Sequence, residues 1–172
     1  PDSQRFSGMM TIPRELSIKD GRICQLPVHE LENYRSNVIR YNNVCIHEET
    51  ELKGISGRSI DLQIALKGNE YGKFRMKLVA DERHYSEVIY DRTHSGFKKD
   101  AISTRSMYVS EKKDVINLRI LVDRFSVEIF VNDGEQVMTS LIYTPVDASG
   151  ISFASNGKTY LDVTKYDIEV TK

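Results

Sequence analysis

The 172-residue sequence has no tryptophan, only two cysteines and only four prolines. It has no apolar run approaching the ~18 residues that a membrane-spanning helix requires, so we expect no contact with a membrane. Its 24 basic and 25 acidic side chains leave a net charge of −1, which gives no basic surface for nucleic acid. The first residue is Pro1 and no leader segment follows, which indicates a piece excised from a longer protein.

The two cysteines, Cys24 and Cys45, lack the spacing of a metal site. No second cysteine or histidine lies two to four residues from Cys24, and only His47 lies near Cys45. The four histidines form no His-x-His or His-x3-His pair. We therefore expect no metal and no cofactor, and we interpret the thiols as free. A disulfide would require Cα atoms within about 7 Å of each other.

The dominant pattern is alternation of apolar and polar residues with a period of two. It runs through Ile60–Leu66 and through three segments between Ile116 and Tyr143, the last two joined by a turn at Asp133-Gly134. Further strands are expected at 44–52, 73–80, 85–90, 151–154 and 160–170, with one helical turn at 29–35, a loop at 91–104 and the start of an edge strand at 107–109. About ten to twelve strands without sustained helical periodicity indicate an all-β fold, either a sandwich or a barrel.

Residues 8–28 are predicted to form a β-hairpin. Two extended runs flank Asp20-Gly21, and Asp-Gly accepts positive φ at both central positions of a type I′ turn. Pro13 lies within the first run and cannot donate a backbone hydrogen bond, which restricts that strand to a sheet edge or a bulge.

Four blocks of sequence carry a resemblance to a known family. They are Gly8–Leu16, with Thr11, Pro13, Arg14, Glu15 and Leu16; Tyr90-Asp91-Arg92-Thr93 with Ser95-Gly96; Leu118–Arg124; and Ser126–Gly134. In this order they resemble the C-terminal domain of glycoside hydrolase family 32, which includes invertases, levanases, inulinases and sucrose-6-phosphate hydrolases. Phe6, where the family usually has tryptophan, and Phe125, where a small polar residue is common, depart from the pattern and put the subfamily in doubt, not the fold.

The resemblance implies one antiparallel two-sheet β-sandwich, concanavalin- or jelly-roll-like, over residues 1–172. Residues 1–28 would be the connector that enters from a missing five-bladed propeller. The parent enzyme would hydrolyse β-fructofuranosidic bonds with two carboxylates about 5–5.5 Å apart. The family takes its catalytic acids from Asn-Asp-Pro-Asn, Arg-Asp-Pro and Glu-Cys types of motif in the propeller, and none of these occurs here. We therefore assign no catalytic residue and expect this chain alone to be inactive.

The candidate functional carboxylates lie at turns or on strands: Asp91, Asp123, Asp133, Glu128 and Glu169. At turns, such groups usually accept backbone N–H bonds; on strands, they face water or pair with arginine. Glu128 lies on a central-looking strand, with Arg119 and Arg124 near in sequence. We expect it to form a structural ion pair.

Phe6, Met9, Met10 and Ile12 are the candidate domain-interface residues. They are apolar and enter from the side of the missing domain, so we expect an exposed patch in this chain. The expected partner is the N-terminal propeller of the same chain, which the sandwich would stabilise; a second copy, in a homodimer, is the alternative.

Two other functions remain open. Tyr85, Tyr90 and Tyr108 could stack on sugars and make the chain a carbohydrate-binding module for fructans, although strand tyrosines commonly have structural roles. The chain could also be a stand-alone, lectin-like interaction protein outside the family. The cysteines and the lysine-rich surface favour the cytoplasm and the sucrose-6-phosphate branch, with secretion as the alternative.

Overall fold

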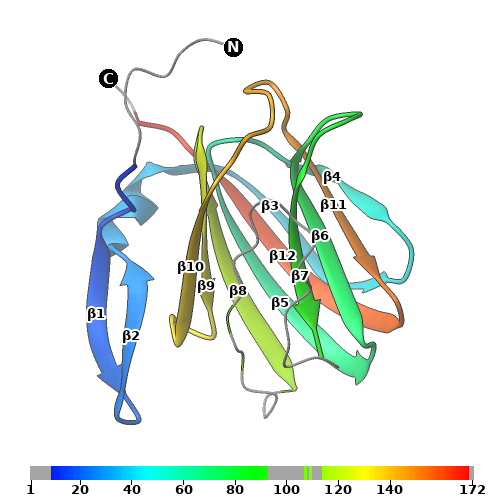
Figure 1. Cartoon of the computed structure of the whole chain (residues 1–172), viewed down its shortest axis with the longest axis horizontal. Coiled ribbons are helices and arrows are strands. Elements are labelled where there is room, and N and C mark those ends of the chain that lie inside the picture. The colour runs from blue at the N-terminus through cyan, green and yellow to red at the C-terminus, as the bar shows by residue number, and fades with distance from the viewer. Residues whose placement is uncertain (1–8, 93–106, 108, 110–113, 171–172) are drawn as a thin grey trace.

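The computed structural model describes residues 9–92, 107, 109 and 114–170. These residues form twelve strands and one short 3-10 helix, arranged as two stacked sheets with a hairpin at one side (Figure 1). The elements are β1 (Arg14–Lys19), β2 (Arg22–Pro27), η1 (His29–Tyr34), β3 (Arg35–Ile46), β4 (Thr50–Ser56), β5 (Ile60–Glu70), β6 (Lys73–Ala80), β7 (Ser86–Asp91), β8 (Val115–Val122), β9 (Ser126–Val131), β10 (Gln136–Leu141), β11 (Gly150–Ser155) and β12 (Lys158–Ile168).

Every strand pairing is antiparallel. One sheet has six strands in the order β10-β9-β8-β5-β12-β3, and the other has four in the order β4-β11-β6-β7. Among the described residues, β1 pairs only with β2. The predicted antiparallel two-sheet sandwich is confirmed. In the described part of the chain, no helix is long and apolar enough to cross a bilayer.

The core lies between the two sheets and follows the predicted alternation. On β5, Ile60, Leu62, Ile64 and Leu66 are each at most 3% exposed. They belong to one apolar cluster with residues of the four-stranded sheet, where the rings of Phe74 and Phe153 stack at 6.3 Å. Residues at odd positions of β5 face outward, because successive side chains of a strand point to opposite faces.

Strand β9 differs from the others because it is buried on both faces. Val127, Ile129 and Val131 join the core, yet Glu128 and Phe130 on the outer face are also only 2% and 1% exposed. The N-terminal segment covers this outer face. The hairpin stands beside β10 at this side of the sandwich (Figure 1).

Two expected strands differ from the structure. The strand predicted at 44–52 is wrong, because the chain leaves β3 at Ile46 and starts β4 at Thr50. Strand β3 begins at Arg35, and positive φ angles at Asn37 and Asn43 accompany register shifts against β12, which breaks the alternation. Met107 and Val109 pack on the core without forming a strand, and Tyr108 lies outside the described residues.

Candidate domain-docking surface

The β1–β2 hairpin presents an apolar face to solvent. Its turn has the expected geometry, with φ of 51° at Asp20 and 72° at Gly21. Ile18 lies directly opposite Ile23, and Leu16 is two residues before Ile18, so the three side chains share one face. They are 69%, 80% and 65% exposed for Leu16, Ile18 and Ile23. We call these three residues the hairpin face.

The segment that leads into the hairpin is also exposed. Met9 is 41% and Met10 is 91% exposed, while Ile12 is half-buried. Phe6, the fourth candidate interface residue, lies outside the described part of the chain. The described candidates therefore adjoin the hairpin face in sequence, and their role in an interface stays a prediction.

A buried ion pair attaches this segment to the sandwich. The Arg14 guanidinium donates to Oε2 of Glu128 at 2.6 Å and to the Thr139 hydroxyl at 2.8 Å, and the backbone N–H of Ile12 donates to Oε1 of Glu128 at 2.6 Å. Arg14 also lies over the ring of Phe130, 5.4 Å from its centroid. Both carboxylate oxygens of Glu128 thus bind the connector, which fixes where the hairpin begins.

The expected ion pair of Glu128 exists, but the expected nearby arginines are not its partners. Arg119 instead donates to Asp61 at 2.8 Å, and Arg124 lies over the ring of Phe125. Glu128 pairs with Arg14, 114 residues away in sequence. Proximity in sequence did not predict the arginine that pairs with Glu128, because the N-terminal segment folds back over the outer face of β9.

A glycine at the β9–β10 turn receives the second strand of the hairpin. The backbone N–H of Gln25 donates to the carbonyl of Gly134 at 3.0 Å. Gly134 has φ +82°, and a Cβ there would lie 2.1 Å from the carbonyl oxygen of Gln25. The hairpin can approach this closely only because the residue has no side chain.

A second buried charge network lies where η1 passes over the six-stranded sheet. Asp61 is fully buried and accepts from Arg35 at 2.7 Å and from Arg119 at 2.8 Å. Glu32 on η1 contacts both arginines, at 3.1 and 3.4 Å. Arg35 also lies 4.5 Å from the ring centroid of Tyr166. The network pins η1, predicted as a helical turn, to strands β5 and β8.

An exposed ion pair joins β1 to η1. Nδ1 of His29 lies 2.6 Å from Oε1 of Glu15, and the His29 backbone N–H donates to the same oxygen at 3.2 Å. This hydrogen bond raises the pKa of His29, with further contributions from the charges of Glu30 and Glu15, and lowers the pKa of Glu15. The ligand atoms of Glu15, His29 and Glu30 lie within 4.8 Å of one another. They are solvent-exposed and paired among themselves, and we assign no metal to them.

The other carboxylates singled out in the sequence also have structural partners. Asp91 contacts Lys73 at 3.0 Å, Asp133 contacts Lys19 at 3.2 Å, and Glu169 accepts from the side chain of Asn37 at 3.3 Å. Asp123 accepts the backbone N–H of Arg124 at 2.6 Å. The partners are in each case protein groups that hold turns or strands together.

The family of the chain follows from comparison with known proteins. The model of the family described as "Glycosyl hydrolases family 32 C terminal" matches residues 30–171. The chain belongs to glycoside hydrolase family 32.

Curated relatives of this family 32 domain are longer enzymes. Sucrose-6-phosphate hydrolase from Staphylococcus xylosus is 32% identical over 180 residues, covering 98% of this chain and 36% of the relative. Sucrose-6-phosphate hydrolase from Escherichia coli is 32% identical, covering 88% and 33%. Levanase from Bacillus subtilis (strain 168) is 32% identical, covering 86% and 25%. The chain thus spans about a third of these relatives or less.

Solved structures share the fold. Fructan 1-exohydrolase IIa from Cichorium intybus has a TM-score of 0.75 at 19% identity, covering 94% of this chain and 41% of that one. Sucrose-6-phosphate hydrolase from Lactobacillus gasseri has a TM-score of 0.69 at 23% identity, covering 91% and 33%. At these identities the likeness establishes the sandwich fold and nothing further.

Of the tyrosines considered for sugar stacking, the two that the structure describes lie near opposite ends of β7 and do not form a common platform. Tyr85 is 51% exposed just before β7, with Lys77 lying 4.9 Å from its ring centroid. Tyr90 is half-buried near the other end of that strand, where its ring packs against Tyr71 at 6.4 Å. Tyr108 lies outside the described residues.

The sequence analysis did not identify Leu16, Ile18 and Ile23 as interface candidates. Their positions on the two strands of a predicted hairpin could have indicated a shared apolar face.

Proposed function

We propose that this family 32 domain is a non-catalytic module that docks on the catalytic domain of a β-fructofuranosidase-type glycosidase. The observation that carries the proposal is the hairpin face, three large aliphatic side chains gathered on one surface and 65–80% exposed. Burying such a side chain contributes about 1.5–3 kcal/mol, and contiguous exposed apolar surface commonly marks an interaction site.

The attachment of the hairpin supports this role. A two-stranded hairpin alone is marginally stable in water, whereas this one is held by the Glu128–Arg14 pair and by the hydrogen bond from Gln25 to Gly134. A partner that binds the hairpin face is thereby held in a defined orientation relative to the sandwich. The module would stabilise the catalytic domain by covering part of its surface.

The partner that we propose is the N-terminal propeller domain of the same polypeptide. The support is that the curated relatives extend well beyond the matched region, since the chain covers 36% of the Staphylococcus xylosus enzyme. The substrate class would be sugars with β-fructofuranosidic bonds, such as sucrose, sucrose 6-phosphate or fructans. The isolated chain should release no fructose from sucrose or levan above the buffer background, and genuine turnover would remove the proposal.

Methionine oxidation tests the docking surface directly. In the isolated chain, dilute peroxide should oxidise Met10 fastest and Met9 more slowly, because they are 91% and 41% exposed, and should leave the buried Met76 intact as an internal control. In the full-length protein that carries this domain, Met10 should be protected. Equal oxidation of Met10 in both proteins would contradict docking at this segment.

A homodimer is the alternative occupant of the hairpin face. Sedimentation of the isolated chain distinguishes it, because a dimer that is lost on Ile18→Ser would favour a second copy over the propeller.

For the compartment we propose the cytoplasm. The support is two free thiols, one of them exposed, and similarity to bacterial sucrose-6-phosphate hydrolases; a cleaved secretion signal in the full-length protein would contradict it.

A further inference from the structure

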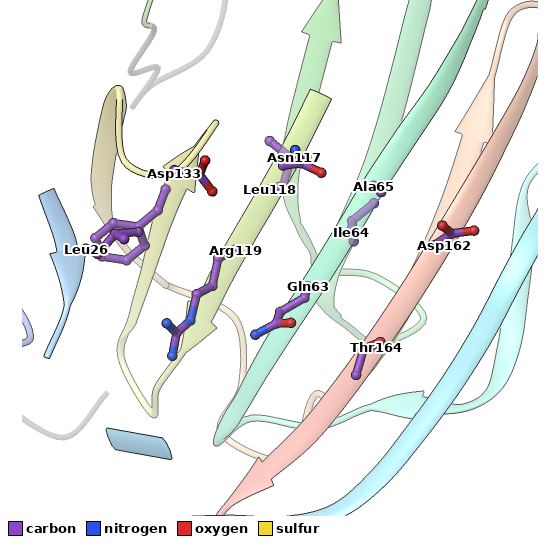
Figure 2. A pocket seen from close by; sticks show the side chains of 11 residues that line it. Leu26, Gln63, Ile64, Ala65, Asn117, Leu118, Arg119, Asp133, Asp162 and Thr164 are labelled. Carbon is purple, nitrogen blue, oxygen red and sulfur yellow. The ribbon is translucent and has the colours of Figure 1, made fainter. Parts of the chain in front are cut away.

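The outer face of the six-stranded sheet contains a shallow hollow of about 400 Å3. Figure 2 shows its lining as two rows of side chains that run across neighbouring strands. In one row Gln63 on β5 lies between Arg119 on β8 and Thr164 on β12; in the other Ala65 lies between Asn117 and Asp162, as the pairing registers require. Leu26 of the hairpin stands at one side.

The small side chain of Ala65 makes the lowest point of the second row. Strands lie about 4.8 Å apart in a sheet, so the flanking Asn117 and Asp162 are separated by about 10 Å across Ala65. The space is open to solvent on the outer side, and its floor is apolar where Ala65 lies. A sugar ring, which has hydroxyls around its edge and C–H groups on its faces, fits this shape.

The polar groups of the hollow differ in whether they already have partners. Within residues 9–92 and 114–170, the side chains of Gln63, Asn117 and Thr164 make no hydrogen bond to another protein group. Two amides and one hydroxyl supply both donors and acceptors. Such mixed groups suit hydroxyl ligands, because each sugar hydroxyl both donates and accepts.

The charges of the hollow, in contrast, are already balanced inside the protein. Arg119 pairs with Asp61 and Glu32, and Asp162 contacts Lys67 at 2.5 Å and accepts the backbone N–H of Asn43 at 2.8 Å. Asp133 at the hairpin side pairs with Lys19. With no uncompensated cation in the described lining, the hollow offers no preference for a phosphate or carboxylate.

We propose that this hollow binds a neutral saccharide, with one sugar ring lying over Ala65 and its hydroxyls bonded to Gln63, Asn117 and Thr164. Binding is weak, because the hollow is shallow and open. The site is separate from the hairpin face and from the tyrosines of β7, so it adds a ligand contact that the docking role does not require. Its ligand class is an uncharged oligosaccharide rather than a sugar phosphate.

Amide NMR of the chain, titrated with 1-kestose, sucrose, sucrose 6-phosphate and glycerol to about 100 mM, tests the site, since a Kd of about 1 mM would be saturated there. We expect saturable shifts from 1-kestose and sucrose around Ala65, Asn117 and Thr164. Sucrose 6-phosphate should bind no more tightly than sucrose, and glycerol should produce no saturable shift.

Three variants complete the test. Ala65→Leu fills the hollow on an outward-facing strand position and should abolish the shifts, while Thr164→Val removes one hydroxyl at constant shape and should weaken binding about fivefold. Gln136→Ala, exposed on the edge strand β10 and outside the lining, should leave binding unchanged. The proposal would be overturned if no shifts appeared, or if they mapped to Tyr85 and Tyr90 instead. It would also be overturned if glycerol reproduced the shifts, if they survived Ala65→Leu, or if sucrose 6-phosphate bound more tightly than sucrose.

Discussion

At the scale of single residues, Glu128 fixes the position of the N-terminal segment on the six-stranded sheet. It is 2% exposed and its two oxygens hold Arg14 and the backbone N–H of Ile12, both at 2.6 Å. A buried charge that loses its partner is costly, because neither water nor another group replaces the lost interaction. Glu128 and Arg14 therefore act as one unit that joins the connector to the sheet.

Replacing Glu128 with alanine should lower the free energy of unfolding by about 3 kcal/mol, the low end for a broken buried pair, because Arg14 keeps 18% exposure. Urea unfolding measures it. Glu87→Ala is the matched control, since the Arg75–Glu87 pair is long at 4.0 Å and its side chains are 59% and 27% exposed. It should cost less than about 1 kcal/mol. Equal losses for the two variants would refute the assigned role of Glu128.

The His29–Glu15 pair predicts a pH dependence with a defined sign. The pKa of His29 is raised above its ordinary 6.5, so its contribution is complete below pH 6.5 and is lost as pH rises through the raised pKa. The pKa of Glu15 is lowered below 4.5, so its contribution is complete above pH 4.5 and is lost as pH falls through the lowered pKa. The pair therefore stabilises the fold most between these two ordinary values.

An NMR titration of the His29 imidazole checks this prediction. Its pKa should lie above 6.5 in the wild type and should fall toward 6.5 in Glu15→Gln, which removes the hydrogen-bonding carboxylate. A His29 pKa that is the same in both proteins would show that the contact with Glu15 does not persist in solution.

At the scale of elements, the hairpin depends on two Asp-Gly turns that require glycine for different reasons. Gly21 has φ +72°, and no atom lies within 4 Å of the point where a Cβ would stand, so its turn needs only a left-handed backbone. Gly134 has φ +82°, and a Cβ there would lie 2.1 Å from the backbone of Gln25. The first turn makes the hairpin, and the second allows it to lie against the sandwich.

The two glycines give a matched pair of variants. Gly21→Ala should cost about 1–2 kcal/mol for the left-handed backbone alone. Gly134→Ala should cost at least about 1 kcal/mol more, because the added Cβ also displaces Gln25 and breaks its hydrogen bond. Amide hydrogen exchange at Gln25 should accelerate in Gly134→Ala but not in Gly21→Ala; equal exchange and equal stability would contradict the close contact.

Strand periodicity predicted most elements because one face of each strand is buried. The meander β8–β9–β10 and strands β5, β6 and β12 follow directly from alternation. Strand β3 could not be found in this way, because it is an edge strand with bulges at Asn37 and Asn43 and a largely exposed surface. Burial of both faces of β9 likewise depends on the connector lying over it, which no local pattern encodes.

At the scale of the whole molecule, the sandwich and its family were predictable, whereas the exposed apolar surface that we propose for docking was predictable only in part. Met9 and Met10 were expected to be exposed because they would adjoin the proposed N-terminal domain, and both side chains are exposed. To predict the larger surface on Leu16, Ile18 and Ile23, one must know which face of the hairpin contacts the sandwich. That choice is made by long-range contacts such as Arg14 with Glu128, 114 residues apart.

The central claim is that the hairpin face binds the catalytic domain, and association of the two parts as separate chains tests it most directly. Sedimentation velocity of this chain mixed with the remainder of the full-length protein should show a 1:1 complex. The complex should be lost with Ile18→Ser/Ile23→Ser and kept with Ile89→Ser, a control residue that is 50% exposed on β7 of the other sheet. A complex that survives the hairpin variant, or that only Ile89→Ser disrupts, would contradict the account.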